Sequence, residues 1–151
     1  MSPANTLTDW QRLEDLATAA FGRVGKSMTE QRRAVLLAMW STKSVMTLET
    51  MSASLDVYHT ASRSSVARAL VDFTDVGIFR RIETRSGYIL APTRTAILLV
   101  CRSCPSVVIV EMTALDTEFA SLASSYEFRV KLAAVEIVGT CADCTRQISI
   151  G

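Results

Sequence analysis

The sequence predicts an α+β protein in two parts, and three observations support this prediction. Four segments with helical apolar spacing come first, and two short strand-like segments around a polar turn follow them. A valine- and isoleucine-rich segment, a helical segment and another strand-like segment then follow in order. All four cysteines form two Cys-x-x-Cys pairs around this second part. We therefore predict a first domain over residues 1–91, a hinge over 92–95 and a small α/β domain over 96–151.

The first helix is expected to begin at residues 8–11, Thr-Asp-Trp-Gln, which have the form of a capping box. Gly22 and Gly25 are expected to end it, because glycine favours helix C-termini. Its apolar face is expected to consist of Trp10, Leu13, Leu16, Ala17, Ala20 and Phe21.

Two further helices follow. Thr29 is placed to cap the second, and Thr47 is expected to start the third. The apolar stripe of the second comprises Val35, Leu36, Met39 and Trp40, and that of the third comprises Leu48, Met51 and Leu55. Residues 58–60, Tyr-His-Thr, are expected to form the turn into the fourth helix.

The fourth helix has the clearest division into two faces. Apolar residues recur at positions i, i+3, i+4 and i+7, so they must face a core: Val66, Ala69, Leu70 and Phe73. A rotation of 100° per residue puts Ser64 and Arg68 on the opposite side, flanked by Ser65 and Ala67. Strands are then expected over residues 78–83 and 88–91, joined by the polar turn 84–87.

A helix pair followed by a hairpin is typical of a winged helix-turn-helix, whose second helix enters the major groove of double-stranded DNA. Arg68, Ser64 and Ser65 are expected to face base edges, while the short Ala67 reaches a thymine methyl at most. The other predicted DNA-binding residues, mostly phosphate contacts, are Arg32, Arg33, Arg63 and, at the tip of the wing, Arg85. Any small three-helix core with a hairpin would give a similar pattern, so DNA binding is one of two interpretations at this point.

The second part is expected to contain a buried strand over residues 106–112 and a helix over 113–125. One or two further strands are expected over residues 128–138. A strand-helix-strand unit this small exposes a sheet edge or face, and a second copy of the same unit is the simplest cover. We therefore predict a homodimer.

The cysteine pairs Cys101/Cys104 and Cys141/Cys144 are separated by 36 residues. Two such pairs supply the four sulfurs of a tetrahedral zinc site, and a site with no open position is structural. Two redox pairs or unrelated thiols are the alternatives. The use of every cysteine in two equal pairs favours one structural zinc per chain.

Charge and hydropathy exclude several classes of protein. Residues 1–95 contain 12 Lys and Arg against 9 Asp and Glu, a net +3, and residues 96–151 contain 4 against 6, a net −2. This weak asymmetry favours nucleic acid as a partner of the first part. We expect no membrane span or signal peptide, and paired thiols then fit a reducing cytoplasm. No nucleophile–base pair is evident, so we expect neither an enzyme nor a small-molecule substrate.

Several motifs point to one family. Residues 28–32, Met-Thr-Glu-Gln-Arg, are similar to Leu-Thr-Pro-Gln-Arg at the start of its second helix. Residues 64–70, Ser-Ser-Val-Ala-Arg-Ala-Leu, stand where it has Ala-Thr-Val-Tyr-Arg-Thr-Leu, and residues 75–78 look like its Ala-Gly-Leu. Gly139 and the cysteine pairs have its spacing. The chain thus resembles, over nearly its full length, the ferric uptake regulator (Fur) superfamily of bacterial metal-responsive repressors. The resemblance implies a homodimer with an N-terminal winged helix, a C-terminal dimerisation domain and a structural zinc.

The chain departs from the family where the family binds its regulatory metal. A histidine-rich run before the first cysteine pair and a histidine before the second are replaced by Thr95, Ala96, Ile97, Leu98 and Ala133. The only histidine is His59, beside the fourth helix, where a capping or phosphate-contacting role is the commoner one. Glu111 is two residues out of register with a family glutamate. The base-contacting tyrosine of the family is Ala67 here.

We interpret the sequence as a Fur-like regulator that has lost its metal-sensing site, so that DNA binding does not depend on added iron, manganese, nickel or zinc. Ile97 and Leu98 are expected to pack across the hinge instead. Two alternatives stay open. The protein senses another signal, such as oxidation of the zinc cysteines, or it is a partner subunit of another family member and does not itself bind DNA.

Overall fold

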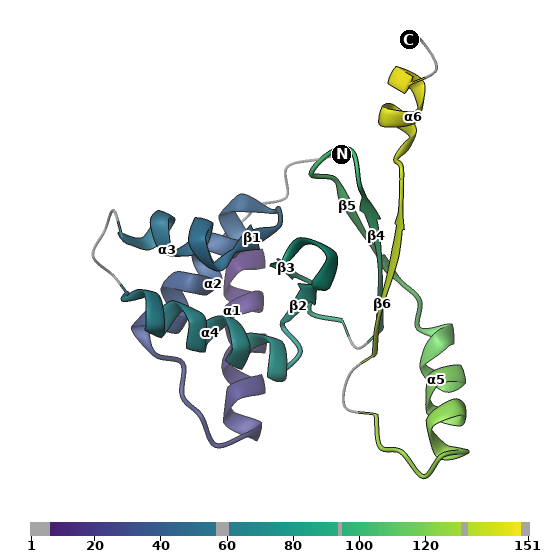
Figure 1. The fold of residues 1–151 in the computed structure, drawn as a ribbon. Helices are drawn as coiled ribbons and strands as arrows, with labels where there is room; N and C mark the ends of the chain where they lie inside the picture. Colours follow the sequence, from purple (N-terminus) through teal and green to yellow (C-terminus); the bar gives the residue numbers. More distant parts are fainter. Residues whose placement is uncertain (1–6, 57–60, 94, 131–132, 149–151) are drawn as a thin grey trace. The chain divides into compact units, whose positions relative to one another are not determined.

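The computed structural model describes residues 7–56, 61–93, 95–130 and 133–148 of the chain. The chain divides into two compact units, Met1–Pro92 and Thr93–Gly151, called the N-terminal and C-terminal units below (Figure 1). The turn expected at residues 58–60, with His59, lies outside the described residues. Among the residues that are described, no helix is both long and apolar enough to cross a membrane.

The N-terminal unit combines four helices with a small antiparallel sheet (Figure 1). Its elements are α1 (Leu7–Arg23), α2 (Glu30–Thr42), β1 (Met46–Thr47), α3 (Leu48–Asp56), α4 (Arg63–Asp75), β2 (Phe79–Ile82), the 3₁₀ turn η1 (Glu83–Arg85) and β3 (Gly87–Leu90). The strand order is β1-β3-β2. The helix pair α3–α4 with the hairpin β2–β3 is the predicted winged helix-turn-helix arrangement, and β1 is an additional strand that the sequence did not predict.

Side-chain caps explain where three of these helices begin. The Thr29 hydroxyl accepts a hydrogen bond from the Arg32 backbone N–H at 3.2 Å and caps α2 as predicted. Thr47 and Thr50 bond each other's backbone N–H groups at the start of α3, and Ser62 caps α4. The prediction for α1 is wrong, because that helix begins at Leu7 and residue 8 therefore lies inside it.

The predicted apolar faces of the four helices meet in one core. The rings of Phe21 and Phe73 lie 5.0 Å apart edge to face, and those of Phe73 and Phe79 lie 4.5 Å apart and stacked. All four core residues predicted for α4 are buried. One residue of the predicted α1 face is not part of the core: Leu16 is 44% exposed. This core fixes α4 against α2 and α3, which leaves the other side of α4 exposed.

The turn of the hairpin is tighter than a simple loop. Ser86 adopts a positive φ of 47° after η1, and Gly87 begins β3 opposite Thr47 of β1. A Cβ on residue 87 would lie 2.5 Å from Cγ1 of Val45. A larger residue at this position would therefore have to displace the Val45 side chain, because β3 passes close to the segment that leads into β1.

The C-terminal unit contains a three-stranded sheet, the helix α5 (Ala114–Ser124) and the short helix α6 (Ala142–Ile148) (Figure 1). Its strands are β4 (Thr95–Cys101), β5 (Val107–Glu111) and β6 (Ala133–Gly139), in the order β5-β4-β6. β4 pairs antiparallel with β5 and parallel with β6. Both flanking strands are therefore edges of the sheet.

Three sequence-based expectations for this unit need correction. The central strand β4 begins at Thr95, a residue assigned to the hinge, and carries buried Ala96, Leu98 and Val100. Of the strand expected over residues 128–138, residues 128–130 are not in a strand, and β6 spans Ala133–Gly139. The strand expected to be buried over residues 106–112 is not buried in the single chain, since β5 is an edge strand and no residue in it is fully buried.

Candidate metal centre and nucleic-acid interface

The parallel pairing of β4 with β6 brings the two cysteine pairs together. Cys101 ends β4 and is paired with Gly139 at the end of β6. Cys141 follows two residues later, and Cys144 lies in the first turn of α6. The four Sγ atoms all lie within 4.8 Å of one another. Two cysteine pairs with 36 residues between them in the sequence therefore form one cluster.

The dimensions of the cluster fit a tetrahedral zinc ion. With Zn–S bonds of about 2.3 Å, the sulfurs of a tetrahedral site are about 3.8 Å apart. The distance from Cys104 Sγ to Cys141 Sγ is 3.7 Å. Cys101 and Cys144 are buried, while the other two thiols are partly exposed. Four protein sulfurs complete the tetrahedron, so the site has no position for a substrate.

Backbone groups support the cluster around Cys101. Its Sγ accepts hydrogen bonds from the N–H of Cys141 at 3.3 Å and of Ser103 at 3.4 Å, and these bonds lower the pKa of Cys101 to about 6. Hydrogen bonding with the Cys141 thiol, together with burial, raises the pKa of Cys144 to about 12. Thiols this close cannot all ionise by themselves. A divalent cation is what allows four thiolates to share the space.

The candidate DNA-binding surface is the solvent-facing side of α4. Ser64 and Arg68 are exposed there, and Ser65 and Ala67 are half-buried, as the helical spacing predicted. The Ser62 hydroxyl lies 3.1 Å from that of Ser64 and 2.9 Å from that of Ser65. The first turn of α4 therefore presents a cluster of hydroxyl groups, with Arg68 one turn further along.

The arginines predicted to bind DNA differ in their present partners. Arg63 forms an exposed ion pair of 2.7 Å with Glu49 of α3, and Arg33 is bonded to Glu14 of α1. For Arg68, the described part of the chain shows no hydrogen bond or ion pair of the guanidinium. Among these arginines, Arg68 thus needs to break no ion pair before it contacts DNA.

A polar cleft of about 200 Å³ lies between α4 and the start of α2. Its lining is Thr29, Gln31, Arg32, Ser65, Arg68, Ala69 and Asp72. Asp72 is the one acidic side chain in this lining, and it is only 6% exposed. The cleft therefore joins the buried carboxylate of Asp72 to the exposed Arg68 of α4.

Two cations satisfy Asp72. Lys26 Nζ lies 2.5 Å from its Oδ1, and Arg32 Nη2 lies 2.6 Å from its Oδ2. Burial acts to raise the pKa of Asp72, but the hydrogen bonds from Lys26 and Arg32 outweigh it and hold the pKa below the ordinary 3.8. The Arg32 guanidinium also lies over the Phe21 ring, 4.7 Å from its centroid. Sequence analysis did not identify Asp72 or Lys26, because both ion pairs join residues at least 40 positions apart.

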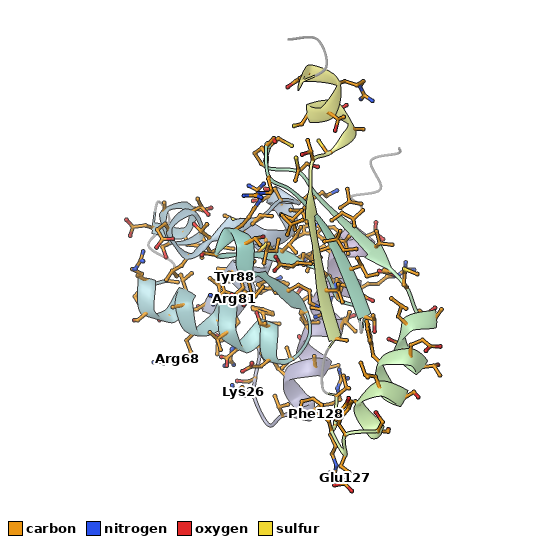
Figure 2. The ribbon with its side chains drawn as sticks, turned by 45° about the vertical axis from the view of Figure 1, so that its right-hand side comes forward. Lys26, Arg68, Arg81, Tyr88, Glu127 and Phe128 are labelled. Carbon is orange, nitrogen blue, oxygen red and sulfur yellow. The ribbon has the colours of Figure 1, made fainter. Side chains whose placement is uncertain are left out.

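The wing carries further charge. Arg81 of β2 forms a 2.9 Å ion pair with Glu83, and its guanidinium lies 5.9 Å from the centroid of the Tyr88 ring (Figure 2). Arg85 ends the 3₁₀ turn at the tip of the hairpin, the position expected for a phosphate contact.

Glu111, the residue near the position of a family glutamate, ends β5 in the C-terminal unit and is exposed.

Comparisons with known proteins agree on one family. The model of the ferric uptake regulator family matches residues 23–138. A zinc uptake regulator complexed with zinc and DNA is similar in structure, with a TM-score of 0.73 at 20% identity over 95% of this chain and 99% of that one. The holo form of XcZur has a TM-score of 0.68 at 20% identity over 90% and 98% of the two chains. A zinc-bound manganese uptake regulator has a TM-score of 0.52 at 26% identity over 85% and 98%. No curated protein matches the chain at a significant level.

Proposed function

The chain belongs to the ferric uptake regulator family, and from this premise we propose that it is a dimeric, sequence-specific, DNA-binding transcription regulator. The observation that carries the proposal is the exposed Arg68, whose guanidinium forms no ion pair with any described residue, on a helix whose opposite face is fixed in a core. Such a helix, followed by a hairpin, has the architecture that reads the major groove. The similar zinc uptake regulator is itself described in complex with DNA.

Within this proposal Arg68 reads base edges, because a guanidinium can donate to guanine O6 and N7 together. Ser64 and Ser65 supply hydroxyl groups beside it, and Ala67 offers a methyl group to thymine. Arg63 and Arg85 contact phosphates. Arg32 and Arg33 are the weaker candidates for phosphate contacts, because the side chains of their carboxylate partners Asp72 and Glu14 are only 8% and 15% exposed, whereas that of Glu49, the partner of Arg63, is 68% exposed.

The zinc in this proposal is structural. Cys101, Cys104, Cys141 and Cys144 hold one ion per chain, which cross-links the ends of β4 and β6 to the start of α6. A tetrathiolate zinc supplies folding energy rather than catalysis. None of the four cysteines forms a disulfide in the structure, which suits action in a reducing cytoplasm.

We propose a second copy of the chain as the cover of the exposed apolar surface of the C-terminal unit. β5 is an edge strand with the sequence Val-Val-Ile-Val-Glu and contains no lysine or proline that would block pairing. A groove of about 520 Å³ between α5 and β6 is lined mainly by apolar residues, among them Phe119, Leu122 and Phe128. Two-fold pairing through this surface places two α4 helices on one DNA site.

The proposed regulator does not use the usual metal sensor of its family. The chain contains one histidine, although imidazole is the preferred nitrogen ligand for such ions. In the described part of the chain, the only group of three or more His, Cys, Asp or Glu residues arranged for a metal is the cysteine cluster. That cluster has no ligand to spare for sensing.

The proposal is tested by selecting bound sequences from a random DNA pool with the wild-type protein and with Arg68→Ala. The wild type should select a roughly palindromic site. Arg68→Ala should bind that site about 1–3 kcal/mol more weakly and should discriminate less between DNA sequences. Arg12→Ala is a matched control, since Arg12 is exposed on α1 and is not one of the predicted DNA contacts. An unchanged preference in Arg68→Ala would assign base recognition to another residue.

The absence of a metal sensor has a separate test. The protein is treated with a mild chelator that leaves the tetrathiolate zinc in place, and DNA binding is titrated with and without each divalent ion. We expect no tenfold change in affinity with any ion. Such a change would instead indicate a sensing site, with His59 and Glu111 as the first residues to substitute.

A further inference from the structure

Arg68 and Asp72 lie four residues apart on α4 and line the same cleft. Opposite charges at this spacing are neighbours on a helix surface and commonly form ion pairs. In the described structure these two residues form none. Each carboxylate oxygen of Asp72 is instead bonded to another cation, Oδ1 to Lys26 and Oδ2 to Arg32.

This arrangement has a consequence for DNA recognition. A carboxylate with a vacant oxygen beside Arg68 would compete with DNA for the same guanidinium. Charge-assisted bonds to Arg are strong and directional, so the competition would draw Arg68 along the helix and away from a base edge. With both oxygens of Asp72 occupied, that competition is weakened and Arg68 remains exposed.

We propose that Lys26 is a positioning residue for base recognition. Its ammonium group bonds to the Asp72 carboxylate, so that the guanidinium of Arg68 on α4 stays available to DNA. This inference rests on the proposed DNA-binding function. Lys26 lies in the loop between α1 and α2, and its side chain is 43% exposed. Figure 2 labels Lys26 and Arg68 along the same side of α4.

Lys26 is the better of the two cations for a test. Arg32 is only 15% exposed and lies over the Phe21 ring, so its removal would disturb the core as well as the ion pair. Among the described residues, the ammonium group of the half-exposed Lys26 bonds to Oδ1 of Asp72 alone. Lys26→Met keeps most of the aliphatic stem, removes the charge and leaves that oxygen vacant.

The test is a double-mutant cycle between Lys26→Met and Arg68→Ala, read as affinity for the sequence selected by the wild type and for a scrambled sequence. Arg68→Ala should weaken binding to the selected site by about 5- to 150-fold, the equivalent of losing one bidentate base contact. Lys26→Met should weaken it by only about 1.5- to 2.5-fold, since a competing helix-surface ion pair is weaker than the base contact. In the Arg68→Ala background, Lys26→Met should then have almost no further effect on preference for the selected site.

The controls separate this role from a direct phosphate contact. Lys43→Met removes one charge from the end of α2 and should lower affinity for both DNA sequences slightly and equally. If Lys26 itself touches a phosphate, its effect will be the same on both sequences and additive with Arg68→Ala, and the inference is then overturned. Adding Asp72→Asn to Lys26→Met should restore the preference for the selected sequence, because the competing carboxylate is gone.

A measurement without DNA completes the test. In Lys26→Met, NMR of the Arg68 side-chain Nε–H should show the shifted resonance and slowed exchange of a guanidinium bonded to a carboxylate. An Arg68 signal identical to that of the wild type would overturn the inference even if DNA binding changed. A wild-type protein that selects no DNA sequence would overturn the proposed function as well, whereas selective binding with an additive cycle would overturn the role of Lys26 alone.

Discussion

The apolar residues of the N-terminal unit are largely enclosed by that unit, whereas those of the C-terminal unit are not. Seventeen buried residues from α1 to β3 form one continuous core in the N-terminal unit. In the C-terminal unit α5 has no buried residue, and Tyr126 and Phe128 are 78% and 68% exposed. Among the described residues, the shorter unit carries eight of the twelve large hydrophobic residues that are exposed: Leu99, Val108, Met112, Leu122, Tyr126, Phe128, Ile137 and Val138.

This difference shows which part of the molecule depends on partners. A four-helix unit with a closed core gains most of its stability from its own side chains. A sheet with two open edges and an uncovered helix must obtain stability from elsewhere, and the proposed function supplies two sources: an ion at the cysteine cluster and a second copy on the exposed surface. We therefore expect loss of the ion or of the second copy to affect the C-terminal unit, and loss of an internal ion pair to affect the N-terminal unit.

The largest expected effect concerns the metal. Cys104→Ser removes one of four ligands, and the apparent binding energy of structural zinc is about 10–16 kcal/mol, so the C-terminal unit should lose both zinc and folded structure. Ser103→Ala, inside the same loop, should do neither. Elemental analysis should find about one zinc per chain in the wild type and the control and almost none in Cys104→Ser. A Cys104→Ser protein that keeps its zinc would contradict the assignment.

The next effect concerns assembly. Val108 is 51% exposed at the edge strand β5, so Val108→Asp would bury an unpaired carboxylate in the proposed dimer interface. We expect the dissociation constant to rise at least about 100-fold, the equivalent of roughly 3 kcal/mol. Val24→Asp is the matched control, because Val24 is 56% exposed in the N-terminal unit. Analytical ultracentrifugation should give a dimer for the wild type and the control; a monomeric wild type at micromolar concentration would refute the dimer.

The smallest effect concerns acid and the N-terminal unit. The lowered pKa of Asp72 means that its ion pairs stabilise the folded state above the ordinary pKa of 3.8, and that this stabilisation is lost as the pH falls through the lowered folded-state pKa. Asp72→Asn should therefore lower the free energy of unfolding by about 1–3 kcal/mol at pH 7. This difference from the wild type should shrink in strong acid. Asp75 is exposed on the same helix, so Asp75→Asn should change the free energy of unfolding little.

Urea unfolding followed by tryptophan fluorescence measures this effect in the right unit, since both tryptophans, Trp10 and Trp40, belong to α1 and α2. An Asp72→Asn protein that is as stable as the wild type at pH 7 would show that the two ion pairs contribute no net stability.

Sequence patterns predicted the parts of the structure that depend on neighbours in the chain. The cap at Thr29 and the two faces of α4 follow from spacings of three and four residues, and both are confirmed. The cysteine cluster was also predictable, because four thiols in two pairs have few other uses. DNA contacts, by contrast, stay predictions.

The missed features depend on distant partners. β4 was not identified as a strand because six of its seven residues are apolar without alternation. Their role depends on parallel pairing with β6, which lies 38 residues further along. The ion pairs of Asp72 were missed for the same reason, since Lys26 and Arg32 are 46 and 40 residues away in the sequence. The apolar sequence of β5 indicates burial, but it does not show whether the same chain or a second copy covers the strand. The exposure of β5 in the single chain could therefore not be predicted from the sequence.

Hydrogen exchange with mass spectrometry on the full chain, before and after removal of zinc by a strong chelator, tests the contrast between the units most directly. The amides of α1 to α4 should keep their protection after zinc removal, while those of β4, β5 and β6 should exchange at rates close to those of an unfolded chain. Addition of zinc should restore the protection. Equal loss of protection in both units, or full protection of β4 to β6 without zinc, would contradict the account of an N-terminal unit that stands alone and a C-terminal unit that depends on its ion.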